Sequence, residues 1–301
     1  MRKSSLFSLI SFALITFVLG TYGIAQTPIT GDWTANIDTK GEKGEIHLSF
    51  ERKHENGGKS QNGTNYNYSD LEGLSREQTQ NGRVSFRLVR EAGTIECEGS
   101  FANGRGVGTF RFTPSRSFID GMRSRGFDFE KVTSSKHSNS PEEKLFAAAT
   151  LNVTTALADD LKSANFGDLD IDDLFKAAIF KIDGKFMAEM KATGFPDLGM
   201  EDLVKARIFK IDAEYVRQVK EMGFTSDGFE GLVKFRIFKV TPEFLNEMRA
   251  AGFEKMSSED IVKCRIFKID AEFARQARAE EPNVSVEEMV QMKIGVRRRK
   301  E

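Results

Sequence analysis

The chain has 301 residues, of which 30% are charged and 39% hydrophobic, and its formal net charge is −1. This length is sufficient for more than one domain, and the near balance of charge argues against a nucleic-acid-binding protein, which carries a basic surface. After the N-terminal segment no apolar run approaches the about 20 residues of a membrane-spanning helix.

The first residues have the features of an export signal. Arg2 and Lys3 precede the mostly apolar run Leu6–Leu19, and Ala25 ends a small-residue site suited to cleavage. The apolar run is shorter than the about 20 residues of a spanning helix, although an uncleaved anchor is the alternative. We therefore expect residues 1–25 to be a signal peptide. The mature protein is then exported to the periplasm or outside the cell, without stable membrane insertion.

The next segment, residues 28–114, has the pattern of antiparallel strands. Apolar and polar residues alternate in Ile46–Phe50 and in Val84–Leu88, as in strands that cover one face of a core. Expected turns are Asp38–Gly44, Ala92-Gly93 and Asn103-Gly104. We expect five or six strands in a small sandwich or barrel, with the polar stretch Asn56–Asp70 as a surface loop.

Two short phrases in this domain suggest ligands. Gly31-Asp32-Trp33 is similar to the Gly-x-Trp start of lipocalin barrels, where the Trp closes a ligand cup; the alternative is a lone Trp that fills a small β core. Gly104–Gly108 looks superficially like a phosphate loop, but the strand pattern Thr109–Phe112 follows it. Phosphate loops need a helix N-terminus at this point, so we exclude nucleotide binding.

A repeat dominates the second half of the chain. Four phenylalanines lie 29 residues apart, and each opens a near-copy of the phrase FKID: Phe180, Phe209, Phe238 and Phe267. Periods of this length are typical of arrays whose units stack to bury a shared core. Each period contains two helix signatures, so we expect residues 151–294 to be tandem 29-residue α-helical hairpins.

The clearest unit shows where each helix begins and ends. Thr241 is suited to be an N-cap, Pro242 fits the first helical position, and Gly252 is placed to end the helix in the left-handed conformation. A shorter helix then starts near Ser257, with Asp260 positioned for a capping box. The corresponding stops in other units are Gly194 and Gly223.

The repeat extends in weaker form to both sides. Residues 115–150 match as a first, interrupted unit, with a polar insertion at Val132–Pro141 that we expect to be disordered. The last unit lacks the glycine stop, as a capping unit would, and residues 295–301 form a basic tail. The expected fold class is therefore α+β, a small antiparallel β domain followed by an α-helical repeat array.

Charged residues also recur. Each of three lysines, Lys205, Lys234 and Lys263, has a glutamate four residues earlier, which favours a local ion pair. Three arginines have no such partner: Arg207, Arg236 and Arg265. They are our partner-binding candidates, because a basic stripe could hold carboxylates of a partner. The alternative is pairing with an acidic residue of the adjacent unit, such as Asp212 or Asp270.

No pattern indicates catalysis, a metal site or a cofactor. The histidines, His47, His54 and His137, have no cysteine or carboxylate at metal-ligand spacing, and no Gly-x-Ser-x-Gly elbow occurs. Cys97 and Cys264 have the settings of small buried residues, with a disulfide between them as the alternative. We expect no enzymatic activity.

A family resemblance rests on the phrase Gly106–Pro114, on Phe118, Met122 and Gly126-Phe127, and on the later Thr-Pro-Glu-Phe phrase. Together they resemble the extracytoplasmic extension of some bacterial proteins related to the antirepressor membrane metallopeptidases that sense β-lactams. The peptidase part is absent here, so peptidase activity is not implied. The resemblance implies an exported, free-standing sensory or interaction module.

The expected function is therefore an exported, non-catalytic protein-interaction or sensory module of a bacterium. It would bind a protein or a cell-envelope component through its repeat array. The alternative is a small-ligand carrier or sensor that uses a cup in the N-terminal β domain.

Overall fold

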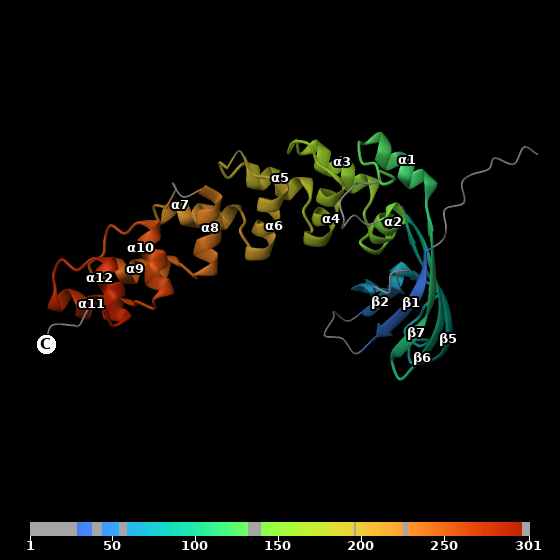
Figure 1. Ribbon diagram of the computed structural model, residues 1–301, viewed down its shortest axis with the longest axis horizontal. Coiled ribbons are helices and arrows are strands. Elements are labelled where there is room, and N and C mark those ends of the chain that lie inside the picture. The colour runs from blue at the N-terminus through green and yellow to red at the C-terminus, as the bar shows by residue number, and fades with distance from the viewer. Residues whose placement is uncertain are drawn as a thin grey trace, which may run out of the picture.

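The computed structural model describes residues 29–37, 44–53, 59–131, 140–195, 197–224 and 228–296. The expected signal peptide, most of the polar insertion, the tail from residue 297, His54 and His137 lie outside these ranges. The described chain forms seven strands followed by twelve α-helices, which confirms the predicted α+β class and helical array (Figure 1). None of these helices combines the length and the apolar character needed to cross a membrane.

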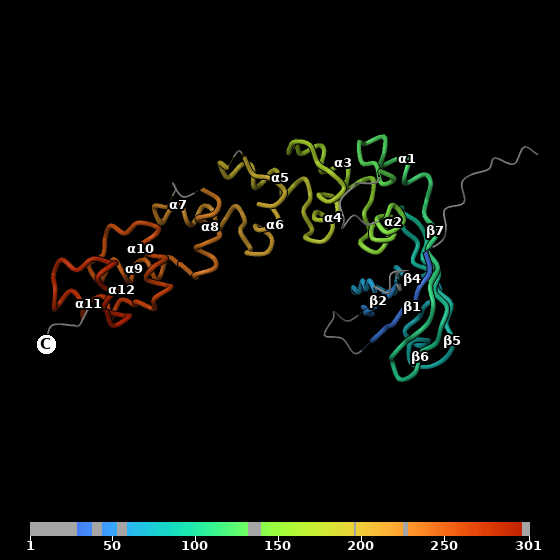
Figure 2. The backbone as a smooth tube through the Cα atoms, viewed as in Figure 1, coloured from blue at the N-terminus to red at the C-terminus, as the bar shows by residue number. Residues whose placement is uncertain are grey.

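All seven strands belong to one antiparallel sheet with the order β3-β2-β1-β7-β6-β5-β4. Their bounds are β1 Ile29–Asn36, β2 Glu45–Lys53, β3 Lys59–Asn67, β4 Leu71–Glu72, β5 Asn81–Arg90, β6 Gly93–Ala102 and β7 Arg105–Pro114. A 3-10 turn, Tyr68–Asp70, joins β3 to β4. The sheet is curved and lies at one end of the helical array, next to α1 (Arg116–Ser124) and α2 (Pro141–Thr150) (Figures 1 and 2).

The sheet corrects two expectations from the sequence. It is a single open sheet with free edges at β3 and β4, and it is neither a sandwich nor a closed barrel. The additional strand, β3, lies within the stretch Asn56–Asp70 that we expected to be a loop. Its side chains are almost all exposed, and only Tyr66 is buried. Because β3 is held by backbone pairing with β2, it needs no apolar alternation and gives no strand signal.

The predicted alternation holds in the other strands. Ile46 and Leu48 are fully buried and Phe50 nearly so, and β5 buries alternate residues in the same way. Asn103 and Gly104 join β6 to β7 with φ of 50° and 76°, as a tight two-residue hairpin requires.

Trp33 lies at the centre of the β core. Its side chain is fully buried, its Nε1 donates to the carbonyl of Glu98 at 3.2 Å, and its ring packs edge-on against Phe86. Two glycines of β7 allow this packing, because a methyl group at Gly106 or Gly108 would lie 2.7 or 2.6 Å from the Trp33 ring. The glycine-rich phrase therefore makes room for Trp33, which agrees with the interpretation of Trp33 as a core residue.

The twelve helices form hairpins of one odd-numbered and one even-numbered helix. The odd helices are α1 Arg116–Ser124, α3 Thr155–Ser163, α5 Gly184–Lys191, α7 Ala213–Glu221, α9 Pro242–Ala250 and α11 Ala271–Glu280. The even helices are α2 Pro141–Thr150, α4 Ile171–Phe180, α6 Met200–Phe209, α8 Gly228–Ile237, α10 Ser258–Ile266 and α12 Val286–Lys293. Helices of the same kind contact each other from unit to unit, as α4 contacts α6 and α6 contacts α8.

The caps predicted from the sequence are confirmed. The Thr241 hydroxyl accepts from the amide of Phe244 at the start of α9, and Ser257 forms a capping box with Asp260 at the start of α10. Pro141, which we had placed in the insertion, is instead the first residue of α2. The odd helix of the last unit ends at Glu281 in extended conformation rather than at a left-handed residue.

Both helices of a typical hairpin end in the same backbone motif. At the end of α9 the amide of Phe253 donates to the carbonyl of Met248, while Gly252 is left-handed with φ of 94°, as in a Schellman motif. At the end of α6 the amide of Ile211 donates to the carbonyl of Ala206 at 2.8 Å. The left-handed residues after α5, α7 and α9 are the predicted glycines Gly194, Gly223 and Gly252, while α1 and α3 end at Gly126 and Asn165. Those after α4, α6, α8 and α10 are Lys181, Lys210, Lys239 and Lys268, each with φ of 53°, while α2 and α12 end at Asn152 and Gly295.

Candidate partner-binding surface

The three candidate arginines lie at the junctions between units. Arg207 Nη2 donates to the carbonyl of Lys181 at 2.6 Å, and its guanidinium lies 3.7 Å from the ring centroid of Phe186. The last carbonyls of a helix have no partner within the helix, so this arginine caps the end of the preceding even helix. It also stacks on the first turn of the odd helix between them.

The other two arginines repeat this arrangement. Arg236 donates to the carbonyl of Lys210 and stacks on Tyr215, and Arg265 donates to the carbonyl of Phe238 and stacks on Phe244. Within the described parts of the chain these arginines do not form the alternative ion pairs with acidic residues of the adjacent unit. Asp212 and Asp270 instead cap the N-termini of α7 and α11. The observed contacts of all three arginines are within the array, and their role in partner binding stays a prediction.

A second series of basic residues joins the odd helices. Each lies near the end of one odd helix and donates to a carbonyl at the end of the odd helix before it, as Lys220 Nζ does to the carbonyl of Thr193 at 2.7 Å. The residues in this series are Lys162, Lys191, Lys220, Arg249 and Arg278. Much of the basic charge of the array therefore holds neighbouring units together.

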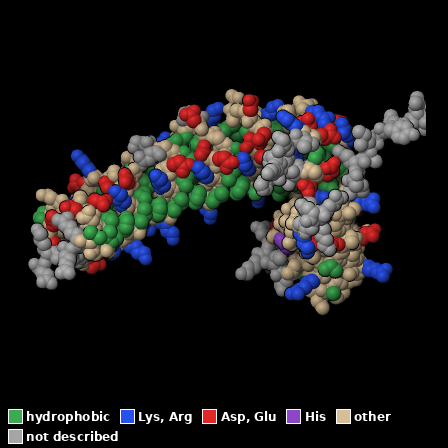
Figure 3. All heavy atoms as spheres, viewed as in Figure 1, with side chains coloured by type: hydrophobic (Ala, Val, Ile, Leu, Met, Phe, Trp, Pro, Cys, Tyr) green, Lys and Arg blue, Asp and Glu red, His purple; other side chains and the backbone are tan. Residues whose placement is uncertain are grey.

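The glutamate–lysine pairs of the even helices also cross between units. The predicted local pair is confirmed at Glu259 and Lys263, 3.2 Å apart. Lys205 instead contacts Glu230 of the next unit and Asp202 of its own helix. Pairs of this kind form a band in which positive and negative charges neutralise each other. This band lies along the array beside a continuous apolar band (Figure 3).

Exposed isoleucines recur on the even helices with the period of the repeat. We call Ile179, Ile208, Ile237 and Ile266 the isoleucine row; their exposed fractions are 53%, 53%, 49% and 45%. Each precedes a half-buried phenylalanine that packs on the core, namely Phe180, Phe209, Phe238 and Phe267. Large apolar side chains exposed in register over four units are typical of an interaction surface rather than of scattered surface residues.

Lysines border this row. We call Lys181, Lys210, Lys239 and Lys268 the lysine row; each follows an isoleucine by two residues and is exposed. Among the described residues none of the four donates a side-chain hydrogen bond or forms an ion pair, unlike Lys205 and Lys263. Their left-handed backbone costs a residue other than glycine about 1 kcal/mol or more. A residue retained four times in an unfavourable conformation suggests a function for its side chain.

The first unit shows what the same helix face looks like when it is covered. In α2 the positions equivalent to Ile179 and Lys181 are Thr150, which is buried, and Asn152, which is also left-handed. This face of α2 packs on the sheet. Phe146 stacks on Phe110 with ring centroids 5.2 Å apart.

Two polar contacts complete this internal interface. Arg52 of β2 pairs with Glu143 of α2 at 3.4 Å, and the hydroxyl of Tyr66 in β3 donates to the carbonyl of Thr150 at 3.1 Å. The exposed isoleucine and lysine therefore appear only in the units that the sheet does not cover.

The sequence contained a signal for this surface that our sequence-based reasoning missed. At about 100° per residue, Ile208 lies about 140° around the helix from Leu203. Leu203 is fully buried and Val204 nearly so, and Ile208, four residues after Val204, lies at the edge of the apolar stripe of its own helix. An isoleucine at this position in four successive units indicates an exposed row.

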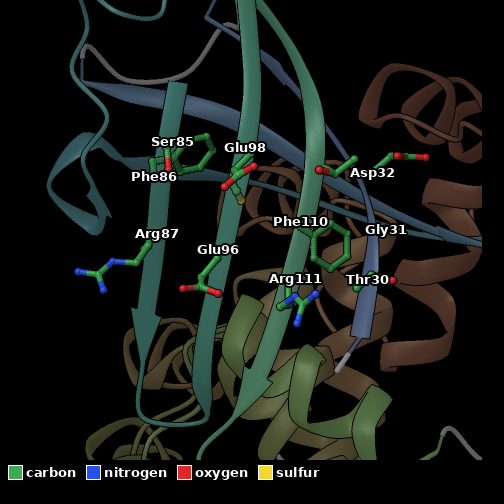
Figure 4. A pocket seen from close by; sticks show the side chains of 12 residues that line it. Thr30, Gly31, Asp32, Ser85, Phe86, Arg87, Glu96, Glu98, Phe110 and Arg111 are labelled. Atoms are coloured by element: carbon green, nitrogen blue, oxygen red, sulfur yellow. The ribbon is translucent and has the colours of Figure 1, made fainter. Parts of the chain in front are cut away.

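Other parts of the described chain offer little for chemistry. An open depression of about 610 Å³ lies over the solvent-facing side of the sheet and is lined by polar side chains such as Asp32, Arg87, Glu96 and Glu98 (Figure 4). Within the described residues no group of three or more His, Cys, Asp and Glu side chains is arranged to hold a metal ion. His47 contacts Asn65 across the β2–β3 pair.

The two cysteines are free and buried, as the sequence indicated. Burial raises the pKa of the Cys264 thiol to about 12 and also raises the pKa of Cys97. Neither thiol has the lowered pKa of a nucleophile.

No protein-family model, curated protein or solved structure matches the chain.

Proposed function

We propose that this chain is an exported, non-catalytic protein-interaction or sensory module, and that its isoleucine row is the surface that binds a partner. Signal-like residues 1–25 and the resemblance to an extracytoplasmic extension support export to the periplasm or the cell exterior. The repeat architecture supports binding, because stacked units create long surfaces for partners.

One observation carries the proposal. The face of α2 that is equivalent to the isoleucine row is covered by the sheet, whereas Ile179 and its counterparts are about half exposed. An apolar row of this length is costly to leave in water, at about 25 cal/mol for each Å². A partner that covers the row recovers this free energy.

The alternative, a small-ligand carrier, needs a cavity on the buried side of the sheet. Trp33, Leu48 and Phe86 fill that side with their own side chains. The depression on the opposite side is polar and open, unlike the enclosed and mostly apolar sites of small-molecule carriers.

The test replaces Ile208, Ile237 and Ile266 together by serine. Because these side chains are about half exposed, we expect the far-UV circular dichroism and the melting temperature to change little. A photo-crosslinking residue placed beside the row is expected to capture an envelope protein, and the serine variant is expected to lose this product.

The matched control removes exposed apolar residues from the sheet. Val89 and Val107 are 43% and 59% exposed, and their replacement by serine should leave crosslinking at the array unchanged. Equal crosslinking by wild type and by the triple serine variant would refute the proposal.

A further inference from the structure

The isoleucine row begins beside an open edge of the sheet. β3 is the outermost strand and pairs with β2 alone among the described strands. An open groove of about 320 Å³ lies between β3 and the helices, and its lining includes Asn62 and Tyr66 of β3, Thr150 of α2 and Ile179 of α4. The free edge and the first isoleucine therefore border the same space.

The edge of β3 is suited to pair with another strand. Its nine residues are almost all exposed, and an edge strand presents unpaired backbone N–H and C=O groups. Addition of a partner strand to such an edge is a recurring mode of peptide recognition. A strand added here would extend the sheet from β3 towards the helices that follow α2.

The adjacent strand, β2, shows how a strand covers this array. Phe50 packs edge-on against Phe146, with ring centroids 5.8 Å apart, and Arg52 pairs with Glu143 at 3.4 Å. Phe50 and Arg52 are two residues apart and therefore lie on one face of β2. One face of β2 therefore provides both an apolar side chain that packs on α2 and a charged side chain that pairs with it.

The next unit presents the same kind of face with an added cation. Phe175 of α4 is equivalent to Phe146 and is only half buried, and Ile179 is 53% exposed. Asp172 is equivalent to Glu143, but the exposed Lys181 replaces the uncharged Asn152. A strand on α4 would therefore meet a cation that α2 does not present, and a carboxylate would pair with it. A second copy of this chain fits poorly, because its own edge strand β3 contains Lys59 and no carboxylate to pair with Lys181.

We infer that the partner contributes an extended, acidic segment that pairs with β3 and covers Ile179 and Lys181 with apolar and carboxylate side chains from one face. This inference rests on the proposed function and specifies its mode. The added strand would extend the sheet along the start of the array. The sheet would then cover the face of α4 as it covers the equivalent face of α2.

The test uses a synthetic peptide with the sequence Thr-Phe-Thr-Asp-Thr-Phe-Thr-Asp-Thr, which has the nine residues of β3. In a strand its Phe and Asp side chains share one face. We expect calorimetric titration of the purified full chain to detect binding, and hydrogen exchange of the amides in residues 59–67 to slow. A control peptide with Lys in place of Asp is expected to bind at least about fivefold more weakly, since each aspartate loses an ion pair.

Two variants locate the binding site. Ile179→Ser is expected to weaken binding about tenfold, because the partner loses apolar contact area. Lys181→Gly is expected to weaken it about twofold to fivefold, while the melting temperature stays the same or rises because glycine adopts the left-handed backbone freely. The matched controls, Val107→Ser on β7 and Asn103→Gly in the β6–β7 turn, change an exposed apolar residue and a left-handed residue outside both rows and should not affect binding.

Four outcomes would overturn the inference. They are no binding of the acidic peptide at about 1 mM, equal binding of both peptides, equal loss in the control variants, or unchanged exchange in β3. Displacement of the peptide by phosphatidylglycerol vesicles would assign the surface to membranes, and a dimer in sedimentation that the peptide dissociates would assign it to a second copy.

Different results would refute the strand mode and the proposed function. Equal loss at Ile179 and at Ile266 without protection of β3 would refute the strand mode but retain the isoleucine row as a binding surface. Unchanged crosslinking by the triple serine variant would refute the row itself.

Discussion

The face of α2 that packs on the sheet and the equivalent face of α4 to α10 have the same helical frame but different surroundings. In α2 this face carries Phe146 and Thr150, which are buried under the sheet. In α6 it carries Val204 and the half-exposed Ile208, followed by Lys210. The comparison indicates that the array has one type of docking face, occupied within the molecule at its first position and open at the later ones.

The left-handed residue that follows each of these helices also differs between the covered and the open face. Asn152, which follows α2, is a residue that adopts the left-handed conformation at little cost, whereas Lys181 and Lys210 do not. Four odd helices use glycine for the same motif, and the last even helix, α12, uses Gly295, so the fold itself does not require lysine. The lysines appear with the open face, which is the expected pattern if a partner's carboxylates meet them.

The largest effect is expected at the covered face. Phe146→Ala removes an aromatic side chain that contacts Phe50, Phe110 and Phe112, and we expect it to lower the free energy of unfolding by about 3–5 kcal/mol. Urea unfolding followed by Trp33 fluorescence and by far-UV circular dichroism measures the change. Because Phe146 joins sheet and array, the two signals are also expected to separate in this variant.

The matched change on the open face is Val204→Ala, at the position equivalent to Phe146. Val204 is 8% exposed but has no sheet against it, so we expect a loss of only about 1 kcal/mol. Similar losses for the two variants would show that the sheet adds little to the stability of α2, and the comparison between the faces would fail.

The repeat and its caps could be predicted from the sequence, because they depend on local chemistry. Thr241 and Ser257 bond to amides three residues away, and Gly223 ends a helix by its own backbone freedom. β3 could not be predicted, because an exposed edge strand is held by backbone bonds to β2 and its side chains carry no pattern. Its only buried residue, Tyr66, bonds to α2, which is a contact made in the folded protein.

The candidate site was harder to predict than the fold. Arg207 and its counterparts attracted attention as unpaired charges, but their partners are backbone carbonyls, which no sequence pattern displays. Ile208 lies beside the repeated phrase, but its exposure was not predicted. Whether a helix face is covered depends on where the sheet docks, and only the structure shows that α2 lies against β1, β6 and β7.

A medium effect is expected at the junctions between open units. Arg207→Ala removes the hydrogen bond to the Lys181 carbonyl and the stacking on Phe186, and we expect a loss of about 1–2 kcal/mol. The comparison variant, Arg217→Ala, removes an exposed arginine that pairs with Glu214 and Glu221 of its own helix. Urea unfolding should show little change for it, and equal effects of the two variants would contradict the role of Arg207 as a link between units.

The smallest effect is expected at the junction of the first two units, which uses an ion pair in place of an arginine–carbonyl bond. Arg125 donates to both carboxylate oxygens of Asp159 at 2.7 Å. This hydrogen bonding lowers the pKa of Asp159 below its ordinary value. A carboxylate with a lowered pKa in the folded state stabilises the protein above its unfolded-state pKa, and this contribution disappears as the pH falls through the folded-state pKa.

Asp159→Asn tests this junction. The melting temperature of the variant is expected to lie slightly below that of wild type from neutral pH down to about pH 5, and the difference should shrink as the pH falls below the ordinary aspartate pKa of about 3.9. The difference in melting temperature between Arg207→Ala and wild type should not shrink in the same way, because a backbone carbonyl does not titrate. A deficit of Asp159→Asn that persists unchanged at about pH 2 would show that this junction depends on packing rather than on charge, and that the covered and open parts of the array are joined by the same means.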